Sequence, residues 1–281
     1  MKPLHALGAD EATRLSGLLF DLDDTFLDHG RLTLHAFESL FRLRKAGLRL
    51  GVLTGRPAGF GQVLCMQWPV DFVVTENGGV TFLDDGGRLR RLDRYRTGER
   101  REQRERLALL ALDLERRFGL APTQDNVLRI SDYTLDIGEL ARPDPESVRA
   151  AEELAREHVY TARSSIHLHL SETGEDKASA AVRVLRERFG EDASQCLHRY
   201  AFIGDSENDS ACFAAFHTTI GVANLSGRPS IGPRYRTTRA RSEGFAEAAA
   251  HLLRLRQSAS LAPAAGEQER PGDQAAPLRQ R

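Results

Sequence analysis

Residues 17–25, with the sequence GLLFDLDDT, carry the clearest indication of the fold. A short apolar run, residues 17–20, changes abruptly into carboxylates, as a buried parallel strand does where it ends at an edge of its sheet. Asp21 and Asp23 follow the run at positions i and i+2, with no arginine beside them. Such a pair is costly unless a cation neutralises it, and Mg²⁺ binds one or two carboxylates together with phosphate and water. Taken alone, the stretch is equally typical of an Asp-rich turn.

Strands and helices alternate downstream of this stretch. A helix is expected from Thr33, an N-cap residue, to Gly47, which ends it. Apolar strands follow at residues 48–53 and 71–75, and each ends in a polar cluster. This alternation predicts an α/β fold with a doubly wound, Rossmann-like parallel sheet. Ligands bind such sheets at the carboxyl ends of the strands, where these polar clusters lie.

The middle of the chain is expected to form an inserted small α/β domain with its own sheet. It contains a predicted hairpin at 80–92, followed by helices and strands at 99–118, 133–137, after Pro145 and at 165–170. The parallel pattern then resumes with a helix at 178–189, a strand at 200–203, a helix after Asp209, a strand at 219–222 and a last helix at 244–255. We therefore expect a core domain at 1–83 and 170–257, the insertion at 84–169, and a disordered tail at 258–281.

Composition excludes several classes of function. Of the 281 residues, Lys and Arg (39) nearly balance Asp and Glu (40), so no net positive field attracts nucleic acid or anionic lipid. No apolar run approaches the roughly 18 residues of a membrane span, and the N-terminus lacks the pattern of a signal peptide. Three cysteines without CxxC spacing favour neither a disulfide framework nor a zinc site. We expect a cytoplasmic protein; its oligomeric state does not follow from the sequence.

Two further polar clusters follow predicted strands. Asp205 ends the strand at 200–203, and Asp209 lies one helical turn further on, so both can face the same edge as Asp21. Asp209 alone would be explained as a helix cap, but converging carboxylates repel one another without a metal. The sequence Thr54-Gly55-Arg56 offers a hydroxyl and backbone N–H groups that suit a phosphate, although Thr-Gly is also common in ordinary turns.

Lys177 is one of only three lysines in a chain whose other basic residues are arginines. It opens the helix that precedes the strand of Asp205. Most lysines are solvated surface residues, but a cation at this place would offset the charge of a phosphorylated carboxylate. We therefore favour a functional role for Lys177.

In this order, DxDxT, TGR, Lys and GDxxND resemble the haloacid dehalogenase superfamily of phosphohydrolases. The resemblance covers about residues 15–255, and the position of the insertion is similar to the cap of the Cof-type branch, subclass IIB. It implies that Asp21 is the nucleophile that forms an aspartyl-phosphate, and that Asp23 is the general acid and base. It also implies a Mg²⁺ site and a phosphate-binding set. The metal residues would be Asp21, Asp23 through its backbone carbonyl, Asp205 and Asp209; the phosphate and substrate residues would be Thr54, Gly55, Arg56, Lys177 and Asn208.

The resemblance favours a Mg²⁺-dependent phosphatase acting on a small phosphorylated metabolite, with a sugar phosphate as the leading substrate class. A phosphosugar mutase of the same fold is the near alternative, and a requirement for a sugar bisphosphate would distinguish it. A catalytically silent ligand-binding relative remains a second alternative, and a receiver-type signalling domain a third. The motif order and the insertion argue against a receiver. Asp24, where many relatives of this cap class have Gly, and the absence of Met-Leu after Asp209 weaken any assignment to a subfamily.

Two other features are given structural interpretations. His167 and His169 alternate along a predicted strand, and because no third metal ligand has suitable spacing, we expect them on the surface of that strand. Residues 76–79, ENGG, either line the site or form a turn into the cap.

Overall fold

The computed structural model describes residues 1–164, 166–225 and 229–261. In these residues the larger domain is built on a nine-stranded sheet. Its strands, in spatial order, are β1 (Lys2–Pro3), β12 (Tyr235–Arg236), β11 (Thr218–Gly221), β10 (Tyr200–Gly204), β2 (Gly17–Phe20), β3 (Arg49–Leu53), β4 (Phe72–Thr75), β5 (Val80–Asp84) and β6 (Leu89–Leu92).

The centre of this sheet is parallel and fixes where the polar loops lie. β10, β2, β3 and β4 pair in parallel, and Leu19 of β2 lies opposite both Phe202 and Gly51. Because the carboxyl ends of parallel neighbours meet at one edge, the loops that follow these four strands are adjacent. Within the described part of the sheet, the antiparallel pairs are β4 with β5 and β5 with β6, so β5 is the strand that runs against the others.

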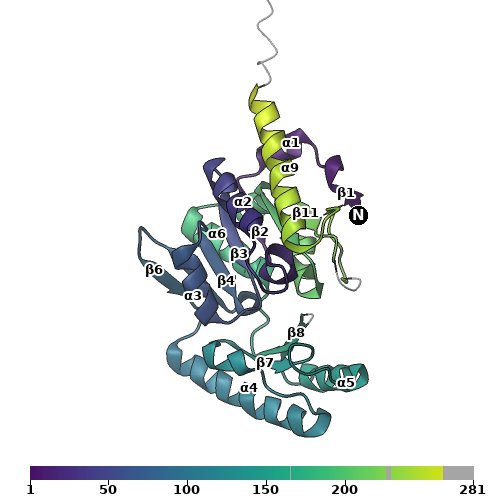
Figure 1. Ribbon diagram of the computed structural model, residues 1–281. Coiled ribbons are helices and arrows are strands. Elements are labelled where there is room, and N and C mark those ends of the chain that lie inside the picture. The colour runs from purple at the N-terminus through teal and green to yellow at the C-terminus, as the bar shows by residue number, and fades with distance from the viewer. Residues whose placement is uncertain (165, 226–228, 262–281) are drawn as a thin grey trace, which may run out of the picture.

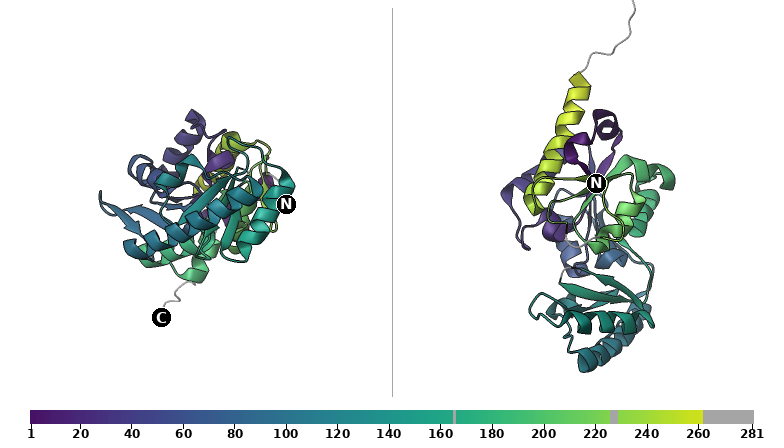
Figure 2. Two further views of the ribbon diagram at one scale, coloured as in Figure 1. Left: turned by 90° about the horizontal axis from the view of Figure 1, so that it is seen from below. Right: turned by 90° about the vertical axis from the view of Figure 1, so that its right-hand side faces the viewer.

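Helices cover both faces of the sheet, as a doubly wound fold requires (Figures 1 and 2). One core cluster joins the sheet to α1 (Ala9–Arg14), α2 (Leu34–Lys45), α3 (Ala58–Gln67) and α9 (Arg241–Leu261). The other joins it to α6 (Lys177–Phe189), α7 (Ala193–Arg199) and α8 (Ser210–Ala215). Short helical segments complete the connections: η1 (Leu4–Ala6), η2 (Leu22–Phe26), η3 (Glu76–Gly78), η4 (Gln124–Leu128) and η5 (Glu207–Asp209). The expected α/β class is confirmed.

A smaller unit lies below the carboxyl edge of the large sheet (Figure 1). Its three strands have the order β7 (Asp132–Asp136), β9 (His167–Ser171) and β8 (Tyr160–Arg163), all antiparallel. The helices α4 (Thr97–Phe118) and α5 (Pro145–Arg156) pack on this sheet through a separate apolar cluster that includes Leu107 and Val148. The helices lie on the side away from the large domain, so the small sheet faces the carboxyl edge (Figures 1 and 2). We call this unit the cap.

Three details differ from the expectations. The hairpin strand β6, at 89–92, pairs with the large sheet, although the expected insertion began at residue 84. The exposed edge strand β8 was not predicted, because YTAR has no apolar alternation. The last helix continues to Leu261, so residues 258–261 are helical where a disordered tail was expected; the remainder of that tail, 262–281, lies outside the described residues.

No helix in the described ranges is long and apolar enough to cross a membrane.

Candidate active site

Four loops at the carboxyl edge of the large sheet bring the predicted residues together. Asp21 follows β2, Thr54 follows β3, and Asp205 follows β10, each directly after the last residue of its strand. Glu76 follows β4 in the same way. These residues lie at one edge because each strand is a short apolar run that is buried in the sheet. The polar residues that follow each run are therefore placed at the carboxyl edge.

Asp21, Asp205 and Asp209 form a buried group of carboxylates. Each offers an oxygen, and these oxygens lie within 4.8 Å of one another. Burial, followed by repulsion from Asp209 and Asp23, raises the pKa of Asp21 to about 7 although Lys177 opposes the shift. Burial, with repulsion from Asp21 and Asp209, raises the pKa of Asp205 to about 9. The group therefore has more negative charge than its protein surroundings neutralise.

Lys177 is the cation of this group. It is the first residue of α6, whose N-cap Asp176 accepts a hydrogen bond from Ser179 N. Its fully buried Nζ donates to Asp21 Oδ1 and to Asp209 Oδ1, both at 2.7 Å. Burial lowers the pKa of Lys177, but Asp209 and Asp21 outweigh burial and raise it above its usual value. A lysine held this way stays charged beside the predicted nucleophile.

Asp209 is already engaged by hydrogen bonds at both oxygens. Its Oδ1 accepts from Lys177, and its Oδ2 accepts from the backbone N–H groups of Asp205 at 2.9 Å and Ser206 at 3.2 Å. Thr25 Oγ1 in turn donates to Asp205 Oδ1 at 3.1 Å. Asp209 thus fixes both Lys177 and the loop that presents Asp205.

The donor set fits a magnesium ion. Mg²⁺ prefers oxygen ligands and keeps several waters beside one or two carboxylates. Asp21 and Asp205 supply two such carboxylates, and the raised pKa values of both mark the place where positive charge is lacking. A single divalent ion would remove that imbalance.

Asp23 and Arg56 form an ion pair at the mouth of this group. The guanidinium contacts both carboxylate oxygens of Asp23, and its plane lies over the ring of Phe60 at 5.0 Å from the ring centroid. The side chain of Asp23 is 41% exposed, in contrast to that of Asp21 at 6%. Asp23 therefore has access to a bound molecule and to water, while Asp21 lies at the floor.

The TGR loop lies against the cap. Thr54 is buried, and its Oγ1 accepts from the backbone N–H of Arg56 at 3.1 Å. A side chain at Gly55 would meet Asn77 Oδ1 and His169 Cε1 at 3.2 Å, so glycine lets the cap approach closely. Asn208 Nδ2 donates to Asn77 Oδ1 at 3.3 Å and so joins the loop after β10 to the loop after β4.

A cavity of about 190 Å³ lies between these loops and the cap. Of the predicted site residues, its walls include Asp21, Asp23, Gly55, Arg56, Asp205 and Asn208. Thr54, Lys177 and Asp209 are not part of its walls but lie next to residues that are.

The cap side of the cavity was missed by the sequence analysis. It is formed by Asp125, Arg129, Glu139, Ser164, Ile166, His167 and His169. The expectation that His167 and His169 lie on a strand surface is wrong, because His169 is buried with Nδ1 at 2.8 Å from Asp132 Oδ2 and His167 lines the cavity. Burial lowers the pKa of His169, so its ring is neutral. In the sequence, the pair of histidines that alternate along a short strand was the one feature that could have indicated a cap side of the site.

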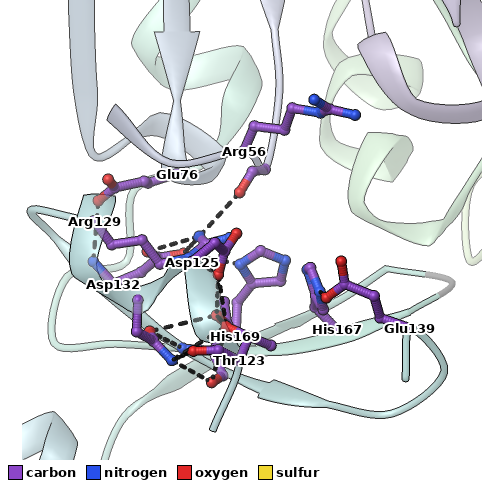
Figure 3. A network of polar contacts seen from close by, with 12 residues as sticks. Arg56, Glu76, Thr123, Asp125, Arg129, Asp132, Glu139, His167 and His169 are labelled. Atoms are coloured by element: carbon purple, nitrogen blue, oxygen red, sulfur yellow. Dashed lines mark hydrogen bonds and ion pairs between the residues drawn. The ribbon is translucent and has the colours of Figure 1, made fainter. Parts of the chain in front are cut away.

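Glu76 joins the two domains (Figure 3). Its buried carboxylate accepts from Ala58 N of the core and, across the boundary, from Ile130 N, from Ser131 N and Oγ, and from Asp132 N. Arg129 of the cap adds a hydrogen bond to Gly55 O at 3.0 Å. The ENGG segment therefore anchors the cap, and its Glu does not face a ligand.

Comparison with known proteins agrees with this geometry. The family model described as sucrose-6F-phosphate phosphohydrolase matches residues 15–250. A phosphoglycolate phosphatase of Methanothermobacter thermautotrophicus is 27% identical over 241 residues, which cover 85% of this chain and 99% of the relative.

Solved structures show the same fold. The sucrose-phosphatase of Synechocystis sp. PCC6803, in complex with sucrose and phosphate, superposes with a TM-score of 0.62 at 22% identity and covers 85% of this chain and 98% of its own. A haloacid dehalogenase-like hydrolase of Bacteroides thetaiotaomicron has a TM-score of 0.62 at 18% identity, with coverage of 85% and 99%.

The fold, the ordered carboxylates and these matches define a phosphoric monoester hydrolase of the haloacid dehalogenase superfamily. Within it, the chain belongs to the sucrose-6F-phosphate phosphohydrolase family.

Proposed function

We propose that this phosphatase uses Mg²⁺ to hydrolyse the phosphomonoester of a small metabolite, a sugar phosphate, through an aspartyl-phosphate at Asp21. The observation that carries the proposal is the contact of Lys177 Nζ with Asp21 Oδ1 at 2.7 Å at the floor of the cavity between the core and the cap. A carboxylate held by a buried ammonium group is fixed in orientation, which favours in-line attack on phosphorus.

In the first step, the Asp21 carboxylate attacks the phosphorus atom and the bond to the substrate oxygen breaks. Asp23 enters this step in its protonated form and gives its proton to the departing alkoxide, so a neutral alcohol leaves and Asp23 becomes a carboxylate. In the second step, Asp23 takes a proton from water, and the resulting hydroxide attacks the aspartyl-phosphate and releases inorganic phosphate and free Asp21. The greater exposure of Asp23 supports this division of roles, since an acid and base must meet both alcohol and water.

The remaining residues bind and orient the phosphoryl group. Lys177 offsets its negative charge, and the Thr54 hydroxyl and Gly55 N–H contact its oxygens. Asn208 and Arg56 lie at the sides of the cavity, where Arg56 also orients Asp23. Electrostatic stabilisation of this kind supplies most of the catalysis in phosphoryl transfer.

Mg²⁺ would be held by the carboxylates of Asp21 and Asp205 and the backbone carbonyl of Asp23. When bound, it supplies positive charge that offsets the developing charge on the phosphoryl oxygens. Asp209 supports the site from behind, since its oxygens already accept hydrogen bonds from Lys177 and from the loop of Asp205.

Phosphate release from a panel of phosphorylated sugars, polyols and nucleotides tests the proposal. The assay is run with Mg²⁺, with EDTA, and with the Asp21→Asn variant, whose fold is checked by circular dichroism. Metal-dependent release that disappears in the variant is expected. No release from any compound by a folded, Mg²⁺-loaded protein would favour the mutase or the ligand-binding alternative. Interconversion of sugar phosphates that requires a sugar bisphosphate would then identify the mutase.

A further inference from the structure

The cap side of the cavity presents carboxylates near the place that a leaving group would occupy. Asp125 is the second residue of η4, and Glu139 lies in the loop after β7 (Figure 3). Both residues line the cavity. Glu139 Oε2 lies 2.9 Å from His167 Nε2, and the Glu139 side chain remains 47% exposed.

The loop that carries Glu139 is built rigidly. Asp136, the last residue of β7, accepts hydrogen bonds from the backbone N–H groups of Gly138, Glu139, Leu140 and Ala141 at 2.7–2.9 Å. Burial alone would raise the pKa of Asp136, but the four donors together outweigh burial and lower it. Because the backbone around Glu139 is fixed in this way, its carboxylate is a defined wall of the cavity and not the tip of a loose loop.

The cationic side chains that line the described cavity are already paired. Arg129 donates to Asp125 Oδ2 at 2.8 Å and to both oxygens of Asp132 at 2.9–3.0 Å, and its side chain is fully buried. His169 is neutral and bonded to Asp132, and His167 is paired with Glu139. On the core side, Arg56 is paired with Asp23.

We propose that the cap selects an uncharged, hydroxylated leaving group and disfavours one that bears a carboxylate, with Glu139 and Asp125 as the determinants. This inference rests on the proposed function and names its substrate class. A hydroxyl group donates to a carboxylate, whereas a second carboxylate has no proton to donate and is repelled. Arg129 is a single guanidinium shared by Asp125 and Asp132, so with Glu139 these cap residues carry more carboxylates than arginines, and a second carboxylate on the substrate would meet that excess.

Two matched pairs of compounds test this selection. Sorbitol 6-phosphate and 6-phosphogluconate differ only at the terminal carbon, which is a hydroxymethyl group in one and a carboxylate in the other; glycerol 3-phosphate and 3-phosphoglycerate differ in the same way. We expect kcat/KM to favour each polyol phosphate over its acid partner by at least about tenfold. The Glu139→Gln variant should bring the ratio several-fold closer to one, and Asp125→Asn should shift it in the same direction. Glu146→Gln, an exposed cap residue outside the cavity, is the matched control and should keep the wild-type ratio.

The outcomes separate the inference from the proposed function. Mg²⁺-dependent release from other phosphomonoesters, together with equal use of both members of each pair, would overturn the inference and leave the phosphatase assignment intact. Glu139→Gln and Glu146→Gln with the same ratio would overturn the role of Glu139. If neither pair is hydrolysed, calorimetric titration of the Asp21→Asn protein decides: tighter binding of the polyol phosphates supports the selection, and equal or weaker binding contradicts it.

Discussion

Arg56 donates two hydrogen bonds to Asp23, from Nε to Oδ2 at 2.9 Å and from Nη2 to Oδ1 at 2.7 Å. The two residues follow different strands, β2 and β3, so the pair joins the DxDxT loop to the TGR loop. A planar guanidinium that contacts both oxygens fixes the plane of the carboxylate as well as its position. The geometry thus orients the group that we propose as general acid and base.

Loss of this orientation should reduce catalysis. We expect Arg56→Ala to lower kcat/KM by about 10²-fold, the lower end of what a positioned acid and base contributes. Arg56→Lys should recover only part of the loss, because an ammonium group cannot make both parallel hydrogen bonds. Steady-state phosphate release measures the effect, with Arg149→Ala on the exposed face of α5 as control. Full activity in Arg56→Ala would show that Asp23 needs no such partner.

Replacing Lys177 should destabilise the protein as well as inactivate it. Lys177→Met leaves the buried carboxylates of Asp21 and Asp209 without their cation. Breaking a buried ion pair on one side costs about 3–5 kcal/mol, so we expect a loss of this size in the free energy of unfolding measured in urea. Lys45→Met, at an exposed lysine of α2, is the matched control and should change stability little. Equal stability of the two variants would contradict the buried pairing.

The stability of the metal-free protein should fall as the pH rises, whereas the stabilisation that Mg²⁺ adds should grow. The pKa values of Asp21 and Asp205 are raised to about 7 and about 9 by burial and mutual repulsion. A folded-state pKa above the unfolded value gives stability that is present at low pH and is lost as the pH rises through the folded value. The metal-free protein should therefore lose stability between about pH 4, near the unfolded pKa, and about pH 9.

Mg²⁺ binds the ionised carboxylates, so its stabilising effect should grow over the same pH range. Thermal unfolding with Mg²⁺ or EDTA measures both effects, and Asp205→Asn should flatten the metal-free profile. A Mg²⁺-induced rise in Tm that is the same at both ends of the range would count against a metal site on Asp21 and Asp205.

Glu76 should govern how firmly the cap is attached. Glu76→Ala leaves several backbone donors at the domain boundary without an acceptor, at about 1–3 kcal/mol for each that stays buried. Burial and the neighbouring Asp132 raise the pKa of Glu76, so a neutral replacement with an oxygen acceptor should be better tolerated. We expect faster hydrogen exchange at residues 130–132 and a higher KM in Glu76→Ala, with smaller changes in Glu76→Gln. Exposed Glu38→Ala is the control; exchange unchanged in Glu76→Ala would refute the anchoring role.

The core could be predicted from the sequence because its pattern is local. Each strand is an apolar run that ends in a polar cluster, so Asp21, Thr54 and Asp205 could be placed at one edge from strand order alone. The contacts between them could not, because Lys177 reaches Asp21 across 156 residues of sequence.

The cap side of the site could not be predicted from the sequence, for a different physical reason. Glu139 and Asp125 occur in polar loops that resemble any solvated surface, and only the docking of the cap turns them toward the core. That docking depends on Glu76 and Arg129, whose contacts across the domain boundary are mostly with backbone atoms, and such contacts do not show in a pattern of side chains. The hairpin was predicted but placed in the wrong sheet, since strand pattern does not reveal which partner a strand will pair with.

Trapping the phosphoryl group during turnover shows whether Asp21 is the nucleophile. Turnover of a hydrolysed phosphomonoester with Mg²⁺ is quenched in acid, and the protein is digested and analysed by mass spectrometry. The account predicts one phosphoryl group on the peptide that contains Asp21, absent from Asp21→Asn. A phosphoryl group on another residue would contradict this role of Asp21. So would the absence of any trapped phosphoryl group at every quench time, if the wild-type protein and Asp21→Asn release phosphate at the same rate.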